Sequence, residues 1–128
     1  MVKLIRPGMV VLRAERYLTG KTRYALVYAK GASWSNKAVV LRAVPNGLEF
    51  SRFGFTVSRR VGGAVVRNRV KRLLREILRQ KPLKPGWDMV FIARIPAARA
   101  KYGELEESVC NLLNRAGLLA GRNEKNRP

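Results

Sequence analysis

The residues best suited to do chemistry in this sequence lie in one basic segment, residues 64–80, which reads AVVRNRVKRLLREILRQ. On a helix of about 100° per residue, its apolar side chains form one stripe and its basic side chains form another. The outward stripe contains Arg67, Asn68, Lys71, Arg72, Arg75 and Arg79, and Arg69 lies on the opposite flank near the edge of the core. Guanidinium groups bind phosphate oxygens through paired hydrogen bonds, whereas an asparagine both donates and accepts, as a base edge or a 2′-hydroxyl requires. The segment is therefore interpreted as a binding surface for a polyanion, with structured nucleic acid favoured.

Like charges follow one another along this stripe at a spacing of four residues. Arg67 and Lys71, Lys71 and Arg75, and Arg75 and Arg79 form such pairs, and Glu76 is the one acid in the segment. Each like-charged pair costs the helix about 0.2–0.5 kcal/mol. A phosphate backbone on this face would offset that cost through counterion release. The competing interpretation is a basic face that is merely solvated.

The composition of the whole chain supports a polyanionic partner. Its 128 residues contain 27 lysines and arginines against 8 acids, which gives a net charge of +19. Self-repulsion of this size does not help a small domain to fold, so an external partner is expected to neutralise it. No apolar run approaches the ~18 residues of a membrane-spanning helix, and the first residues do not read as a signal peptide, so no membrane partner is expected. The single cysteine, Cys110, excludes an internal disulfide and favours a reducing, cytoplasmic location.

The residues that catalysis would need are largely missing. The chain has no histidine and one aspartate, Asp88. The one close group of acids, Glu104, Glu106 and Glu107, is expected at the start of a helix, where negative charge stabilises the helix dipole. A two-metal nuclease needs several converging carboxylates, so we expect no catalytic residue and no metal site in the protein. A stand-alone nuclease is disfavoured, and any reaction would depend on a partner and its metal ions.

The elements that must position the basic segment can be read from periodicity and turn signals. Helices are expected over residues 21–30, 64–80 and 104–116, and strands over 36–44, 53–60 and 87–94, with room for one more short strand. In the first strand Val39, Leu41 and Ala43 share one face, and Ala38, Val40, Arg42 and Val44 share the other. This order predicts an α+β fold, a small two-layer sandwich in which helices pack on one sheet.

The domain organisation is expected to be simple. Residues 1–18 form a basic N-terminal arm, residues 19–119 form a single nucleic-acid-binding domain, and residues 120–128 form a disordered polar tail.

The stretch RFGFTVSRRVGGAVVRNRVKRLLREILR, residues 52–79, resembles the signature region of the bacterial ribonuclease P protein family. Arg67, Asn68 and Arg69 match the Arg-Asn-Arg motif of that family, and the basic residues that follow the motif match Lys71, Arg72 and Arg75. The segment DMVFIARIPA, residues 88–97, resembles the last strand of the family. The resemblance extends over roughly residues 20–115 of the chain.

The resemblance implies a fold and a function. The fold has one mixed sheet and a left-handed β-α-β crossover, similar to the second domain of a small-subunit ribosomal protein. The function is that of the non-catalytic protein subunit of a ribonucleoprotein endonuclease that removes the 5′ leader of precursor tRNA. The RNA subunit and Mg²⁺ would carry out the hydrolysis, and the partners would be ribonuclease P RNA and precursor tRNA.

The resemblance also implies which residues hold each RNA. The catalytic RNA would lie on the long helix, and the leader would lie in a cleft between the first helix and the sheet, lined by Tyr24, Tyr28, Val40 and Arg42. Arg42 stands where some members have an aromatic residue, so a guanidinium plane would replace a ring. Two alternatives stay open: ordinary packing for Tyr24 and Tyr28, and a ribosomal protein or RNA chaperone of the same fold with no enzyme context.

Overall fold

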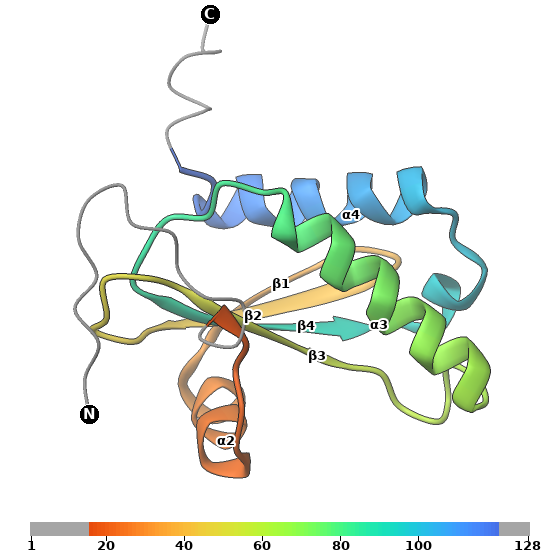
Figure 1. Ribbon diagram of the computed structural model, residues 1–128, viewed down its shortest axis with the longest axis horizontal. Helices are drawn as coiled ribbons and strands as arrows, with labels where there is room; N and C mark the ends of the chain where they lie inside the picture. The colour runs from red at the N-terminus through yellow and green to blue at the C-terminus, as the bar shows by residue number, and fades with distance from the viewer. Residues whose placement is uncertain (1–15, 121–128) are drawn as a thin grey trace, which may run out of the picture.

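The computed structural model describes residues 16–120 (Figure 1). In chain order the elements are the helix α2 (Lys21–Lys30), the strands β1 (Ala32–Ser35), β2 (Val39–Pro45) and β3 (Arg52–Thr56), the helix α3 (Ala64–Arg79), the strand β4 (Trp87–Ala93), the 3-10 helix η1 (Ile95–Arg99) and the helix α4 (Tyr102–Ala116). The expected elements are all present, and β1 is the additional short strand for which the sequence left room.

The four strands form one mixed sheet in the order β1-β2-β4-β3. The pairs β1–β2 and β2–β4 are antiparallel, and the pair β3–β4 is parallel. The chain connects these two parallel neighbours through α3, which makes the β3-α3-β4 segment a crossover unit. The left-handed sense of that crossover remains a prediction from the family resemblance.

Strand β4 lies inside the sheet and is buried on both faces. Five of its residues, Asp88 to Phe91 and Ala93, are buried. A strand that is covered on both faces reads as an almost continuous apolar run, which is the character of the sequence MVFIA in this element.

Helices α3 and α4 cover one face of the sheet and enclose the larger core (Figure 1). Helix α3 contributes Val70, Leu74, Ile77 and Leu78, α4 contributes Leu105, Val109, Leu112 and Leu113, and the sheet contributes Leu41, Phe53, Met89 and Phe91. Burial of these side chains fixes the rotation of α3 about its axis, so its basic stripe must face away from the sheet.

Helix α2 packs on the opposite face of the sheet and adds a partial third layer to the predicted sandwich (Figure 1). Its one buried residue, Val27, joins Leu18 and Val90 in a small second core. The sheet can hold a helix on this side because Val44, Val90 and Ile92 present an apolar surface there.

Several boundaries differ from those predicted. The strand expected over 53–60 ends at Thr56, because Val61 and Gly62 donate backbone hydrogen bonds to Ser58 and Arg59 in a turn. The helix expected from residue 104 begins at Tyr102, where the Glu104 side chain accepts a hydrogen bond from the backbone nitrogen of Lys101 at 2.8 Å. This capping role for Glu104 agrees with the sequence interpretation.

Only parts of the predicted arm and tail fall within the described residues. Tyr17 forms a parallel bridge with Phe53, and Leu18 is buried, so the end of the predicted arm belongs to the domain. Residues 1–15 of the arm and residues 121–128 of the tail lie outside the described residues.

Candidate RNA-binding surfaces

The outward face of α3 carries cations that the protein does not use for its own structure. Asn68, Arg72 and Arg79 are exposed, and Arg67, Lys71 and Arg75 are half-buried. Within residues 16–120, none of these five cations forms a hydrogen bond or ion pair with another side chain or backbone group. Their donors are therefore available to an external acceptor along three turns of helix.

The C-terminal half of this face is hollowed. Tyr17, Arg72, Arg75, Glu76 and Arg79 line a cavity of about 260 Å³. The hydroxyl of Tyr17 is buried and has no hydrogen-bond partner among the described residues. Three guanidinium groups and one carboxylate leave this cavity with a net positive charge, which suits a phosphate.

Arg69 is placed differently from the other predicted RNA-binding residues of α3. Its two terminal nitrogens donate to the backbone oxygens of Ala98, at 3.3 Å, and Ala100, at 2.9 Å. These carbonyls lie at the end of η1, where a helix leaves acceptors unsatisfied. Arg69 thus ties α3 to η1 inside the protein.

The face of the sheet beneath α2 brings the predicted leader-binding residues together. In the sheet register Arg42, Val90 and Gly54 form one row across β2, β4 and β3, and Val40, Ile92 and Thr56 form the next row of this face. The ring of Tyr24 covers Gly54 so closely that a methyl group there would lie 2.0 Å from the tyrosine oxygen. Burial is the main cause of the raised pKa of Tyr24.

Tyr28 and Arg42 are held at the C-terminal end of α2. The hydroxyl of Tyr28 shares a hydrogen bond of 2.5 Å with Thr56 Oγ1, while the residue as a whole remains 38% exposed. A terminal nitrogen of Arg42 donates to the backbone oxygens of Tyr28, at 2.7 Å, and Gly31, at 3.2 Å. Arg42 therefore caps α2, where a positive charge stabilises the helix dipole.

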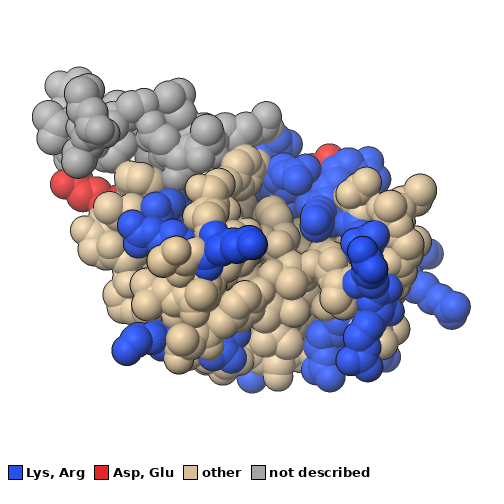
Figure 2. Space-filling view, turned by 90° about the horizontal axis from the view of Figure 1, so that it is seen from below, with Lys and Arg blue, Asp and Glu red and all other residues tan. Residues whose placement is uncertain are grey.

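Figure 2 looks onto the face that carries α2 and shows basic side chains at both sides of a largely uncharged surface. The broader basic band lies at the end of the molecule where β3 and β4 finish and α3 begins.

Known proteins that are similar to this chain in sequence and fold include several ribonuclease P proteins. The chain matches the family described as Ribonuclease P over residues 12–117. The ribonuclease P protein component of Dehalococcoides mccartyi is 53% identical over 114 residues, which cover 89% of this chain and 95% of the relative. The structure of the RNase P protein from Thermotoga maritima superposes with a TM-score of 0.72 at 32% identity, and the match covers 77% of this chain and 96% of that one. The structure of the RNase P protein from Staphylococcus aureus superposes with a TM-score of 0.75 at 27% identity, and the match covers 81% of this chain and 97% of that one.

This chain belongs to the ribonuclease P protein family. It is accordingly a protein subunit of a ribonucleoprotein endonuclease. The alternative of a ribosomal protein or RNA chaperone with no enzyme context is therefore excluded.

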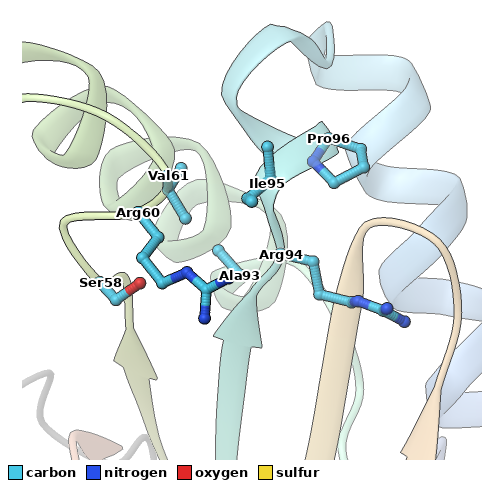
Figure 3. A pocket seen from close by; sticks show the side chains of 7 residues that line it. All are labelled: Ser58, Arg60, Val61, Ala93, Arg94, Ile95 and Pro96. Carbon is cyan, nitrogen blue, oxygen red and sulfur yellow. The ribbon is translucent and has the colours of Figure 1, made fainter.

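The structure contains a further cavity that the sequence did not predict. About 370 Å³ in volume, it lies at the carboxyl ends of β3 and β4 and is lined by Ser58, Arg60, Val61, Ala93, Arg94, Ile95 and Pro96 (Figure 3). Both arginines line the cavity, and a terminal nitrogen of Arg94 donates to the backbone oxygen of Asn36 at 2.9 Å. Ile95 is 55% exposed beside the cavity. In the sequence, Arg94 directly follows β4 and Arg60 lies four residues after the end of β3, so neither belongs to a helical charge stripe.

Three carboxylates, those of Asp88, Glu104 and Glu106, form structural hydrogen bonds within the described residues. Asp88, which is 1% exposed, accepts hydrogen bonds from Arg52 Nε and Nη2 at 2.9 and 2.8 Å and from Asn46 at 2.9 Å. Glu106 pairs with Lys81 at 2.8 Å, and that hydrogen bond raises the lysine pKa. No group of three or more potential metal ligands occurs among the described residues. Nor is any described helix long and apolar enough to span a bilayer.

Proposed function

We propose that this subunit binds ribonuclease P RNA along α3 and the 5′ leader of precursor tRNA on the face that carries α2. The holoenzyme then cleaves one phosphodiester bond and releases the leader from the mature tRNA.

The observation that carries the proposal is the unpaired cationic face of α3. Arg67, Lys71, Arg72, Arg75 and Arg79 have no partner within residues 16–120, although like charges this close repel one another. Asn68 lies exposed among them and provides a donor and an acceptor for a base edge or a ribose hydroxyl. Arg69 contributes positive charge to this region, but the two hydrogen bonds described above point its guanidinium inward.

The proposal for the leader rests on the half-exposed ring of Tyr28. An unpaired base stacks on an aromatic ring with a gain of about 1–3 kcal/mol. Tyr24, Val40 and Arg42 form the surroundings of that ring on the same sheet face. Ser58 lies two residues after Thr56, so the cavity lined by Arg60 and Arg94 continues this path and offers the guanidinium group of Arg60, unpaired among the described residues, to the leader phosphates.

The protein would act by binding, with no catalytic residue of its own. Mg²⁺ held mainly by the RNA subunit would supply the chemistry of hydrolysis, while the cations of α3 neutralise phosphates. Fewer free Mg²⁺ ions are then needed to fold and hold the RNA. Because the precursor carries a leader and the product does not, contact with the leader favours substrate over product. We expect the protein to act in the cytoplasm.

The test is cleavage of a precursor tRNA at low Mg²⁺ by a bacterial ribonuclease P RNA, with and without this protein, and by the protein alone. Substrates with and without an unpaired leader are compared for affinity in the same samples. Cleavage only with RNA and protein together, and a protein-dependent preference for the substrate with a leader, are the expected results. Stimulation without that preference would refute the leader site, and cleavage by the protein alone would refute the absence of catalytic residues.

A further inference from the structure

A separate cavity lies on the other side of Pro96 from the one in Figure 3. It has a volume of about 230 Å³ and is enclosed by η1, the start of α4 and the turn before β2. Its lining residues are Lys37, Ala38, Pro96, Arg99, Ala100, Glu104 and Ser108. Pockets that enclose a whole drug-sized ligand measure roughly 300–1,000 Å³, so this one suits a ligand the size of a single base with its attached groups in solvent.

The charges around this cavity face one another without pairing. Lys37 and Arg99 form no hydrogen bond or ion pair within the described part of the chain, and neither pairs with Glu104. One oxygen of Glu104 accepts from the backbone nitrogen of Lys101 at 2.8 Å, and its second oxygen is free of any described donor. A ligand that carries an anionic group at one end and N–H donors at the other would satisfy both signs of charge at once.

The walls of the cavity are fixed before any ligand arrives. Asn36 donates to the backbone oxygen of Ser108 at 2.9 Å and accepts from the backbone nitrogens of Ala38 and Val39 at 3.1 and 3.0 Å. These bonds tie the turn before β2 to α4. On the opposite wall, Arg69 ties η1 to α3. Because this backbone is held in place, ligand binding would order mainly the exposed side chains of Lys37, Arg99 and Glu104, which limits the entropy lost.

We propose that this cavity binds one unpaired guanine nucleotide. The phosphate lies between Lys37 and Arg99, and the flat base rests on Pro96 and the methyl groups of Ala38 and Ala100. Guanine presents two adjacent N–H donors on its Watson–Crick edge, and a carboxylate such as Glu104 accepts two parallel hydrogen bonds. Uracil presents one such donor between two carbonyl oxygens, which a carboxylate repels.

The choice of a nucleotide over other ligands with a phosphate rests on the proposed function, because an RNA-binding subunit meets unpaired nucleotides. The site shares no residue with the α3 stripe or with the face beneath α2, and it shares Pro96 with the cavity in Figure 3. Its occupant is either a free nucleotide or a nucleotide within an RNA strand.

The experiment is a titration of the ¹⁵N-labelled full chain with GMP, UMP and inorganic phosphate at constant ionic strength, followed by amide chemical shifts. GMP is expected to shift the amides of the lining residues in a saturable way, with a Kd on the order of 0.1–1 mM, and UMP to bind several-fold more weakly. Arg99→Ala should weaken GMP binding about fivefold or more, since it removes a charge-assisted phosphate contact. Glu104→Gln retains an oxygen for the helix cap and should abolish the preference for GMP over UMP.

Lys84→Ala is the matched control, since it removes one positive charge from an exposed position in the turn before β4, outside the cavity and both proposed RNA surfaces. Equal loss of GMP binding in Lys84→Ala and Arg99→Ala would show general attraction to a basic protein and overturn the site. Shifts from inorganic phosphate that match those from GMP would overturn the assignment to a nucleotide.

A second arm identifies the source of the nucleotide with the RNA oligomers UUGUU and UUUUU. Tighter binding of UUGUU than of GMP, lost in Arg99→Ala, assigns the site to RNA, whereas no gain from the oligomer assigns it to a free nucleotide. Nucleotide binding here without stimulation of precursor cleavage would refute the proposed function and leave this site standing. Stimulated cleavage without nucleotide binding would refute this site and leave the proposed function standing.

Discussion

The outer face of α3 and the sheet face beneath α2 use their polar groups in opposite ways. On α3 the guanidinium groups of Arg72, Arg75 and Arg79 have no internal hydrogen bonds among the described residues. Beneath α2 the polar side chains bind one another and the backbone: Tyr28 binds Thr56, and a terminal nitrogen of Arg42 binds two carbonyls at the end of the helix. The Nε of Arg42 is buried without a partner among the described residues. One surface offers free charge, and the other offers a fixed shape.

This difference indicates a division of labour between affinity and selectivity. Free cations neutralise phosphates wherever a backbone passes, which gives strong, salt-dependent and sequence-tolerant binding. A rigid surface with a half-exposed ring can accept an unpaired base only where geometry allows, so it distinguishes substrates that have a leader from those that do not. Substitutions on the two surfaces should therefore change different measurements.

The largest effect is expected from removal of three free cations in the variant Arg67→Ala, Arg72→Ala, Arg75→Ala. Each lost phosphate contact should reduce the slope of log affinity against log salt by about one unit, and the combined variant should bind ribonuclease P RNA at least about a hundredfold more weakly. The preference for substrate with a leader should persist in whatever holoenzyme still forms. The same three positions changed to lysine should keep most of the salt slope, so an equal loss in both variants would mean that charge is not the cause.

The next largest effect is expected from Tyr28→Ala, which acts on the other surface. Loss of the ring should weaken binding of precursor tRNA by about 1–3 kcal/mol and leave mature tRNA unaffected. Tyr28→Phe retains the ring, loses the hydrogen bond to Thr56 and should keep most of the affinity. Equal weakening of precursor and mature tRNA, measured by equilibrium binding to the holoenzyme, would remove Tyr28 from the leader site.

A smaller effect on the same surface is expected from Gly54→Ala. The new methyl group would lie 2.0 Å from the hydroxyl of Tyr24, so the ring must move and overpacking should cost about 1–3 kcal/mol of stability. The preference for leader-bearing substrate should fall several-fold, while the salt slope for ribonuclease P RNA stays constant. Gly63→Ala is the control, because a methyl group there meets no atom within 4 Å. The comparison fails if both glycine variants behave alike in thermal unfolding and in leader preference.

Much of the architecture could be predicted because it depends on periodicity. The alternation of Val39, Leu41 and Ala43 fixed which face of β2 is buried, and the stripe of Val70, Leu74 and Ile77 fixed which face of α3 carries charge. Gly117, in the left-handed conformation with φ of 71°, ends α4 directly after residue 116, the last residue of the predicted helix. These features follow from short-range order along the chain.

The features that the sequence did not reveal depend on contacts between distant segments. A glycine inside a strand indicates that another group approaches the backbone closely. The sequence does not indicate that the group at Gly54 is the side chain of Tyr24, thirty residues earlier. Likewise, Arg60 and Arg94 line the same cavity because β3 and β4 are parallel neighbours in the sheet. The periodicity of the sequence does not encode that arrangement. Charge on a helix wheel also cannot distinguish an arginine that is free from one that reaches a neighbouring carbonyl.

Arg69 is the residue for which that last distinction matters most, and its substitution should have the smallest effect on RNA binding. Because its guanidinium binds the carbonyls of Ala98 and Ala100, Arg69→Ala should leave the salt slope for ribonuclease P RNA unchanged within about half a unit. It should instead destabilise the fold by about 1–3 kcal/mol, since two carbonyls at the end of η1 lose their donor. Urea unfolding and RNA titration over a range of salt, made on Arg69→Ala and Arg72→Ala side by side, separate the two roles. A slope reduced equally in both variants, with stability preserved, would place Arg69 on the RNA surface with the rest of its motif.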